Sequence, residues 1–337
     1  MISMAVNIRD IAQHAGVSVS TVSRVLNNKP DVNAETLERV NEAIDTLGYS
    51  PNSVARGLVL KKSQVLGFVV PDITNPNFPE LARGVVERAR AHGYSVIFFD
   101  TNHDNKVEKE ALKLLRSKQV DGIIVSFSEA NLDELVKLKE EKFPAVQIYR
   151  KSPKSFISTI AIDNVDSAYR AVQYLMGRGH RRIGHITTGE ATLSGAERLE
   201  GYRRAYVEAG LEFRDEWIFS GPHSAETGYR GMKQFLGQPE RVTAVFASHD
   251  LMAVGAYEAV YEKGLSIPGD VSLMGHDNVE ISRLVHPKLT TIDTFKKKLG
   301  QAGVDLLLEE MAETTRINRE IVFKTELVIR DSVRSLE

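Results

Sequence analysis

The sequence predicts an all-α N-terminal helix-turn-helix region followed by an α/β core of two doubly wound parallel-sheet lobes. Apolar side chains recur at helical spacing in the N-terminal region, whereas from residue 64 onward short β-branched runs alternate with amphipathic stretches. Such alternation is typical of parallel strands joined by helices. The length of 337 residues suits two or three compact units.

The first expected helix has an apolar stripe at i, i+3, i+4 and i+7. Gly16 follows this stripe and supplies the backbone freedom that a helix end needs. Ser18 is a favourable cap for the next helix. The sequence therefore predicts a short helix, a turn at Gly16 and a second helix. The stripe consists of Ile8, Ile11, Ala12 and Ala15.

Two further helices are expected in the N-terminal region. The second buries Val22, Val25 and Leu26 and ends at Asn27-Asn28. The third begins after Asn33, which is followed by the acidic Glu35, and ends at Gly48. Its expected buried face is Leu37, Val40, Ile44 and Leu47.

Seven strands and seven helices are expected in the core. The number of strands is enough for two lobes, each with its own sheet. The strands are expected at residues 65–70, 95–99, 122–126, 145–149, 183–187, 244–247 and 271–275. The helices are expected near residues 81–91, 109–118, 132–141, 167–178, 199–209, 225–236 and 252–263.

The second N-terminal helix has the outer face that a DNA-reading helix needs, small and polar enough to enter the major groove. Ser18 and the free amides of the helix N-terminus can hold a phosphate, and Arg24 can donate two hydrogen bonds to a guanine edge. The alternative is a three-helix bundle with a solvated polar face. The outer face consists of Val19, Ser20, Thr21, Ser23 and Arg24.

Two runs of sequence closely resemble the DNA-binding headpiece of the lactose-repressor family. They are Ile8–Asn27 (IRDIAQHAGVSVSTVSRVLN) and Gly48–Leu58 (GYSPNSVARGL). The resemblance implies that Val19 and Ser20 set the base specificity, with Arg24 beside them. It also implies that phosphates or flanking base edges are contacted by Ser18, Thr21, Ser23, Asn27, Tyr49 and Asn52.

The segment 52–60 is too short to be a stable helix alone, and Gly57 weakens it further. The resemblance implies a hinge helix that folds on DNA, including Ala55, and a leucine, here Leu58, that wedges between base steps of the minor groove. The alternative is a linker helix with Leu58 packed on the core. We expect the Leu58→Ala variant to lose operator affinity and keep effector binding.

The core resembles that of the same family, which shares its fold with periplasmic sugar-binding proteins. Ligands of such sheets bind beyond the carboxyl ends of the strands, between the lobes. Arg198 and Asp277 match positions that grip effectors, and Phe78 matches an apolar wall. The alternative role of Arg198 is an ion pair that stabilises a lobe. Capping of helix starts is an equal alternative for Asp163, Asp166 and Asp250. The full expected set is Asp72, Asn77, Phe78, Arg150, Asp163, Asp166, Ser194, Arg198, His223, His249 and Asp277.

Three histidines depart from the residues usual in the family. His223 and His276 stand where an aromatic residue is common, and His249 where Asn or Ser is usual, while Asn77 replaces a frequent aromatic. If all three histidines line one pocket with Arg198, the site favours an anionic effector such as a sugar acid or a phosphorylated sugar. The alternative is that they lie behind the pocket or on the surface. No short-range ligand spacing supports a metal site, so none is expected.

Several function classes are disfavoured by the sequence. It lacks cysteine, so disulfides and thiolate metal sites are excluded, and its net charge of −2 argues neither for nor against nucleic acid. No signal peptide and no membrane-spanning run is visible, so we expect a cytoplasmic, nucleoid-associated protein. The motifs of serine hydrolases, phosphate loops and HExxH metalloproteases are absent, so neither an enzyme nor a cofactor is expected. A transport-type binding protein remains the alternative.

The resemblance implies the following organisation. A homodimer binds a pseudo-palindromic double-stranded DNA operator, because paired hinge helices need a twofold axis. The effector is expected to be a sugar or sugar derivative, with a purine or an anionic sugar as the alternative. The C-terminal residues show no heptad repeat of the kind that tethers a tetramer, so a dimer is expected. The expected domains are residues 1–50 (DNA binding), 51–63 (hinge) and 64–337 (core), with lobe one at about 64–162 and 293–323 and lobe two at about 163–290 and 324–337.

Overall fold

The computed structural model describes residues 6–26, 29–49, 62–117, 120–126, 131–149, 157–313 and 317–336. The chain divides into two compact units, Met1–Gln64 and Val65–Glu337. Of the expected hinge 51–63, only Lys62 and Ser63 are described, and neither belongs to a helix or strand. No helix of the described residues is long and apolar enough to cross a membrane.

The N-terminal unit is a three-helix headpiece of α1 (Ile8–Ala15), α2 (Val19–Leu26) and α3 (Ala34–Leu47). Asn7 and Asp10 cap the start of α1 reciprocally: Asn7 Oδ1 accepts from the Arg9 amide at 2.9 Å, and the Asn7 amide donates to Asp10 Oδ2 at 2.8 Å. Gly16 ends α1 at a φ of 63°, as the sequence predicts.

The headpiece has a small core formed by all three helices. Ile11, Val22 and Val40 are fully buried at its centre. Leu37 was expected to be buried, and this prediction is wrong, because its side chain is 40% exposed. The buried stripe of α3 runs through Val40 and Ala43, while Leu37 lies on the first turn, at the edge of that stripe.

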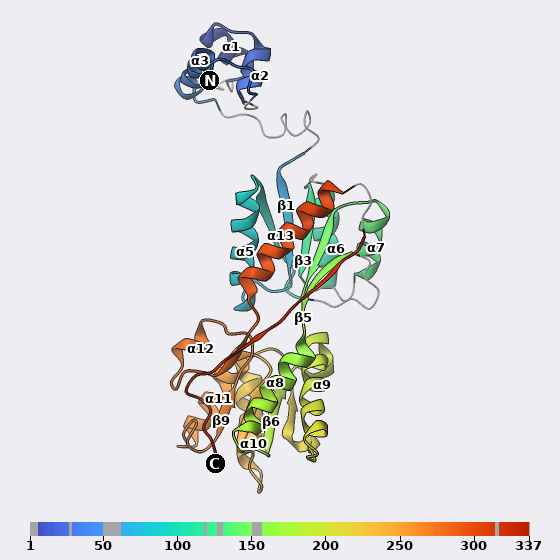
Figure 1. Cartoon of the computed structure of the whole chain (residues 1–337), viewed down its shortest axis with the longest axis vertical. Coiled ribbons are helices and arrows are strands. Elements are labelled where there is room, and N and C mark those ends of the chain that lie inside the picture. The colour runs from blue at the N-terminus through green and yellow to red at the C-terminus, as the bar shows by residue number, and fades with distance from the viewer. Residues whose placement is uncertain are drawn as a thin grey trace. The chain divides into compact units, whose positions relative to one another are not determined.

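Lobe one of the core is a six-stranded parallel sheet with strand order β11-β5-β4-β3-β1-β2 (Figure 1). Its strands are β1 (Val65–Val70), β2 (Ser95–Asp100), β3 (Gly122–Ser126), β4 (Ala145–Ile148), β5 (Ser158–Ile162) and β11 (Glu320–Phe323). Its helices are α5 (Asn77–Ala91), α6 (Asn105–Ser117), α7 (Leu132–Glu140) and α13 (Lys296–Ala312).

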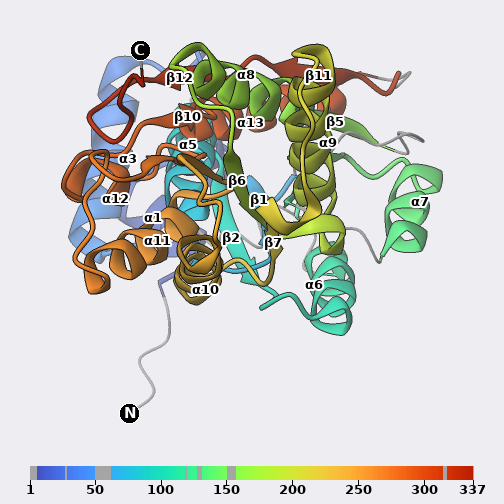
Figure 2. The ribbon, with the colours of Figure 1, turned by 90° about the horizontal axis from the view of Figure 1, so that it is seen from below.

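Helices α5 and α13 cover one face of this sheet, and α6 and α7 cover the other (Figure 2). Because side chains alternate along the strands, the sheet has two hydrophobic layers, one under each pair of helices. On β3, Ile124 packs with α5 and α13, while Ile123 and Val125 pack with α6 and α7. Because both faces are covered, the central strands β1, β3 and β4 are mostly apolar.

Lobe two has a four-stranded parallel sheet with strand order β7-β6-β8-β9. Helices α8 and α9 pair on one face, and α10 and α11 pair on the other (Figure 2). The strands are β6 (Ile183–Thr187), β7 (Ile218–Ser220), β8 (Ala244–Ala247) and β9 (Ser272–Met274). The helices are α8 (Asn164–Gly177), α9 (Leu193–Glu208), α10 (Ala225–Gly237), α11 (Asp250–Glu262) and α12 (Ile281–Leu284), with 3-10 turns at Gly189–Ala191 and Asp215–Trp217.

The chain passes between the lobes three times: after β5, between β10 (Thr291–Asp293) and α13, and between β11 and β12 (Glu326–Val328). The strands β10 and β12 pair antiparallel. The predicted fold class is confirmed, and each of the seven expected strands matches an observed strand to within one residue at either end. The elements that were not predicted are β5, β7, β10, β11, β12, α12 and α13.

Candidate functional site

The outer face of α2 is polar and accessible within the headpiece. Val22 and Val25 point into the core, whereas Val19 is 42% exposed and Ser20 is also exposed. Ser18 caps the helix, because its Oγ accepts from the Thr21 amide at 3.1 Å. An apolar methyl group and a hydroxyl group at the start of a helix are suited to reading base edges.

The other expected DNA contacts divide into two groups. Arg24 forms an exposed ion pair with Asp31 at 3.0 Å, which water and salt weaken, so its guanidinium remains available to DNA. Ser23 is half-buried, and Tyr49 packs against the headpiece core. The remaining four positions lie outside the described residues: Asn27, Asn52, Ala55 and Leu58.

A cavity of about 250 Å³ lies between the two lobes of the core, beyond the carboxyl ends of the strands. Its lobe-one side is mostly polar, with Phe78 and Pro71 as apolar walls. Four expected residues line it, namely Phe78, Ser194, His223 and His249. The full lining is Pro71, Asn75, Phe78, Thr101, His103, Asn105, Glu108, Thr188, Thr192, Ser194, His223 and His249.

Sequence reasoning missed most of the hydroxyl and amide groups of this cavity. Thr101 directly follows β2, and Thr188 directly follows β6. The rule that ligands bind beyond the strand ends would have identified both. Glu108 gives no such signal, because it lies within α6, in its first turn, where it accepts a hydrogen bond from Asn131 Nδ2 at 2.8 Å.

Asp277 is the centre of the polar network beside the cavity. Its Oδ2 accepts from Asn77 Nδ2 at 2.9 Å and from His249 Nδ1 at 2.8 Å, and its Oδ1 accepts from His276 Nδ1 at 3.0 Å. Asn77 belongs to lobe one and Asp277 to lobe two, so the first of these bonds bridges the lobes. The Asp277 backbone has a φ of 110°, which is strained for a non-glycine residue and fixes the carboxylate in place.

Arg198 is a buried partner of Asp277 and is not among the residues that line the cavity. Its Nη2 lies 3.6 Å from Asp277 Oδ1, and its Nε donates to Asn164 Oδ1 at 3.0 Å. Its Nη1 donates to the Ser248 carbonyl and lies 3.2 Å from His249 Nδ1. The arrangement is the ion pair that the sequence left open as the alternative role of Arg198.

Burial decides the charge of the histidines. It lowers the pKa of His223 to about 3 and the pKa of His249 to about 4, so both rings are neutral at pH 7. It also lowers the pKa of His276 to about 4. His276 is fully buried behind Asp277, with its Nε2 3.0 Å from Ser167 Oγ, so only two of the three histidines line the cavity.

Burial acts to raise the pKa of the Asp277 carboxyl, but its histidine neighbours and the Arg198 guanidinium outweigh this effect. They hold the pKa well below its usual range. At Asp250, burial is the dominant effect and raises the pKa of the carboxyl to about 8. The carboxyl of Asp250 accepts from the Val279 amide and from Thr291 Oγ1, so it joins the β9 and β10 segments.

Other expected residues do not line the cavity. Asp163 caps α8 by accepting from the Asp166 amide at 3.0 Å, and Asp166 pairs with Arg170 at 2.7 Å. Asp72 accepts from the amide and hydroxyl of Thr74 and shapes the loop after β1. Arg150 lies outside the described residues.

Two family models cover most of the chain. Residues 7–52 match the bacterial regulatory proteins of the lacI family, and residues 63–328 match the periplasmic binding proteins and sugar binding domain of the LacI family. The chain belongs to the LacI family. The headpiece and the two-lobed core are therefore the two parts of a LacI-family regulator.

Individual relatives match along nearly the whole chain. The transcriptional repressor PurR of Mannheimia succiniciproducens is 37% identical over 330 residues, covering 98% of this chain and 99% of that protein. A lac repressor dimer solved with operator and the anti-inducer ONPF has a TM-score of 0.89 at 28% identity, covering 98% of this chain and 100% of that one. A LacI-family regulator from Enterococcus faecium with bound ribose has a TM-score of 0.73 at 28% identity, covering 81% and 100%.

Proposed function

We propose that this LacI-family chain is a sequence-specific transcription repressor whose DNA affinity is controlled by an uncharged, hydroxyl-rich small molecule of the sugar class. The lining of the interlobe cavity is the observation that carries this proposal. The repressor acts as a homodimer on a pseudo-palindromic operator, and Val19 and Ser20 select its bases. The effector binds between the lobes and changes their closure.

The lining supports a neutral polyol over an anion. Hydroxyl and amide side chains supply paired donors and acceptors on both lobes, and Phe78 supplies an apolar wall for a ring face. No lysine or arginine is among the described lining residues, while the carboxyl of Glu108 is. An anionic effector would meet neutral histidines and this carboxyl, and nothing in the lining would offset its loss of hydration.

One solved relative and the family model of the core support the same class. The Enterococcus faecium regulator was solved with ribose, and the family model of the core is described as a sugar binding domain. The cavity volume of about 250 Å³ is on the scale of a small sugar or a nucleoside.

Lobe closure supports the coupling between effector and DNA. Asn77 and Asp277 hold the lobes together with a hydrogen bond at the cavity. A ligand hydroxyl that takes over one partner of this bond would stabilise one degree of closure over another. When two ligands are coupled in this way, binding of the effector commonly changes the DNA affinity by 5- to 150-fold, or roughly 1–3 kcal/mol.

The test uses the full chain. Duplexes selected from a random pool are measured by fluorescence anisotropy with neutral sugars, sugar acids, sugar phosphates and purines, and each compound is also titrated calorimetrically. We expect one neutral sugar to bind and to change duplex affinity at least about fivefold. Tighter binding of an acid or phosphate would overturn the effector class, and no duplex preference at modest salt would overturn the function.

Variants separate the two sites. Ser194→Ala should weaken sugar binding without changing the duplex affinity measured in the absence of sugar. Ser220 is an exposed serine on the edge strand β7, so the control variant Ser220→Ala should leave both affinities unchanged. Replacing Val19 and Ser20 should switch the preferred duplex and keep sugar binding. A Val19/Ser20 variant with the original preference would contradict the assigned DNA-reading face.

A further inference from the structure

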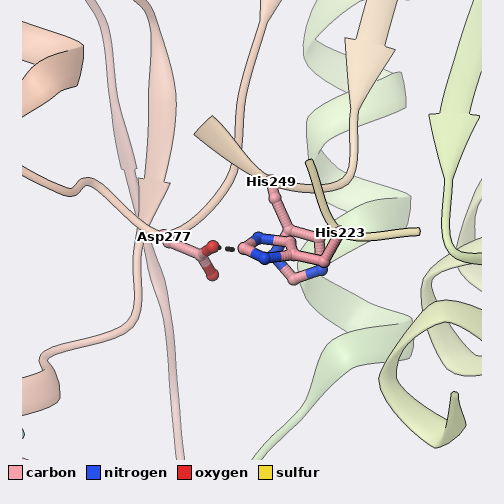
Figure 3. A group of neighbouring side chains, drawn as sticks. All are labelled: His223, His249 and Asp277. Atoms are coloured by element: carbon pink, nitrogen blue, oxygen red, sulfur yellow. Dashed lines mark hydrogen bonds and ion pairs between the residues drawn. The ribbon is translucent and has the colours of Figure 1, made fainter. Parts of the chain in front are cut away.

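Three loops at one end of the lobe-two sheet bring metal-ligating side chains together (Figure 3). His223 follows β7, His249 follows β8 and Asp277 follows β9. One ligand atom from each residue lies within 4.8 Å of the others. The centroids of the two imidazole rings are 4.0 Å apart, and the rings meet edge to face. No other group of this kind is found among the described residues.

We propose that His223, His249 and Asp277 bind a divalent transition-metal ion of the zinc class at the wall of the interlobe cavity. Two imidazoles and one carboxylate are a ligand set that such ions prefer, and this set leaves a coordination position open. Since His223 and His249 line the cavity, the open position faces the space assigned to the effector. The metal site shares that cavity with the proposed function, but its occupancy can be measured without DNA.

Small movements would convert the observed arrangement into a ligand set. His249 Nδ1 and Asp277 Oδ2 now share a hydrogen bond of 2.8 Å. A metal between them would replace the shared proton and widen the gap to about 3.3 Å, the separation of two ligands on tetrahedral zinc. The displaced proton moves to Nε2 of the same ring, so the imidazole stays neutral.

The surroundings both support and limit the site. His276 and Asn77 donate to Asp277 and hold its orientation, as outer partners do in metal sites. The Arg198 guanidinium opposes a cation, because it lies 3.2 Å from His249 Nδ1 and is only partly offset by Asp277. We therefore expect weaker binding than at a structural zinc site.

The experiment titrates Zn²⁺ into the full chain, without a histidine tag, by calorimetry at pH 7. The chain has no cysteine, so thiolates cannot compete. We expect one ion per chain, and we expect Co²⁺ to give visible d–d absorption from a site of nitrogen and oxygen ligands. His223→Gln and His249→Gln should each weaken binding by at least about 10- to 100-fold, the effect of losing even an outer partner.

His103→Gln is the matched control, because His103 lies in the same cavity but outside the cluster. It should keep the wild-type stoichiometry and affinity. Absence of saturable Zn²⁺ binding and of Co²⁺ absorption in the wild-type chain would overturn the site, and this result needs no variant to fold. Binding that survives in both cluster variants would also overturn it. Duplex affinity measured without metal tests the proposed function separately.

Discussion

His185 lies between two aromatic rings in the centre of lobe two. Its imidazole stacks on Tyr202 and on Phe246, each with a centroid separation of 5.0 Å. Nδ1 donates to the Phe246 carbonyl at 2.9 Å, while the buried Nε2 has no hydrogen-bond partner among the described residues. Burial lowers the pKa of His185 to about 4, so the folded protein holds this ring neutral.

His185 should therefore weaken the fold in acid. The unfolded chain binds a proton at this ring below its ordinary pKa of 6.5, whereas the folded chain does not until the pH approaches 4. The free energy of unfolding falls as the pH drops through this interval, by about 3 kcal/mol at pH 4 from this residue alone. The contribution is absent above pH 7.

The check compares urea unfolding of the wild type and His185→Phe between pH 7 and pH 4. Phenylalanine retains the ring stacking but cannot titrate, so the wild type should lose up to about 3 kcal/mol more than the variant. His92→Phe, a substitution at a partly exposed histidine in lobe one, serves as the control. Equal pH slopes for the wild type and His185→Phe would show that the buried ring titrates normally.

Helices α10 and α11 approach each other more closely than side chains normally permit. A Cβ atom added to Gly255 would lie 1.7 Å from the Ala225 carbonyl oxygen, and one added to Gly228 would lie 1.7 Å from the Met252 carbonyl oxygen. The two glycines therefore set the distance between these helices. The contact keeps the segments that carry His223 and His249 side by side.

Gly255→Ala should lower the free energy of unfolding by roughly 1–3 kcal/mol, the usual cost of overpacking, although alanine favours a helix. Gly177→Ala is the matched control at the end of α8. An added Cβ there meets nothing within 4 Å, so this variant should be neutral or more stable by up to about 1 kcal/mol. Thermal and urea unfolding of both variants measure the difference. Unchanged stability of Gly255→Ala would mean that the helices separate without cost.

At the level of elements, the sequence predicted those strands and helices whose own residues show a clear apolar pattern. The strand from Val65 was predicted correctly because it is apolar along its length and ends at a polar loop. The strand from Ile183 was also predicted, although it contains His185. The strands β7, β10 and β12 have only three residues each and show no period. Helix α13 opens with three lysines and is apolar on more than one side, so its pattern does not resemble a surface helix.

The sequence predicted only part of the candidate site. Four of the predicted effector-binding residues line the cavity, namely Phe78, Ser194, His223 and His249. The sequence also predicted effector contacts for Asp163 and Asp166, but these side chains interact with groups of α8 instead. Linear sequence does not show which side of a helix start faces the partner lobe. For the same reason it did not place His276 behind Asp277 or bring the metal-ligating group together.

At the scale of the whole molecule, the proposed homodimer gives a mass that can be measured. One chain has a mass of 37.5 kDa. Light scattering after gel filtration should give twice this value, because paired headpieces are needed to contact an operator of adequate length. A mass of four chains at low concentration would contradict the dimer. A mass of one chain that persists at high concentration would do so as well.

The three passages between the lobes have a consequence for a nicked chain. A cut between β5 and α8 yields one fragment with most of lobe one and a second fragment with lobe two, α13 and β11. Leu299, Val304 and Leu307 of the second fragment fill a hydrophobic layer of lobe one. The cut pieces should therefore stay associated, and separately expressed fragments should complement each other. Neither lobe can be obtained by trimming the gene at a single point.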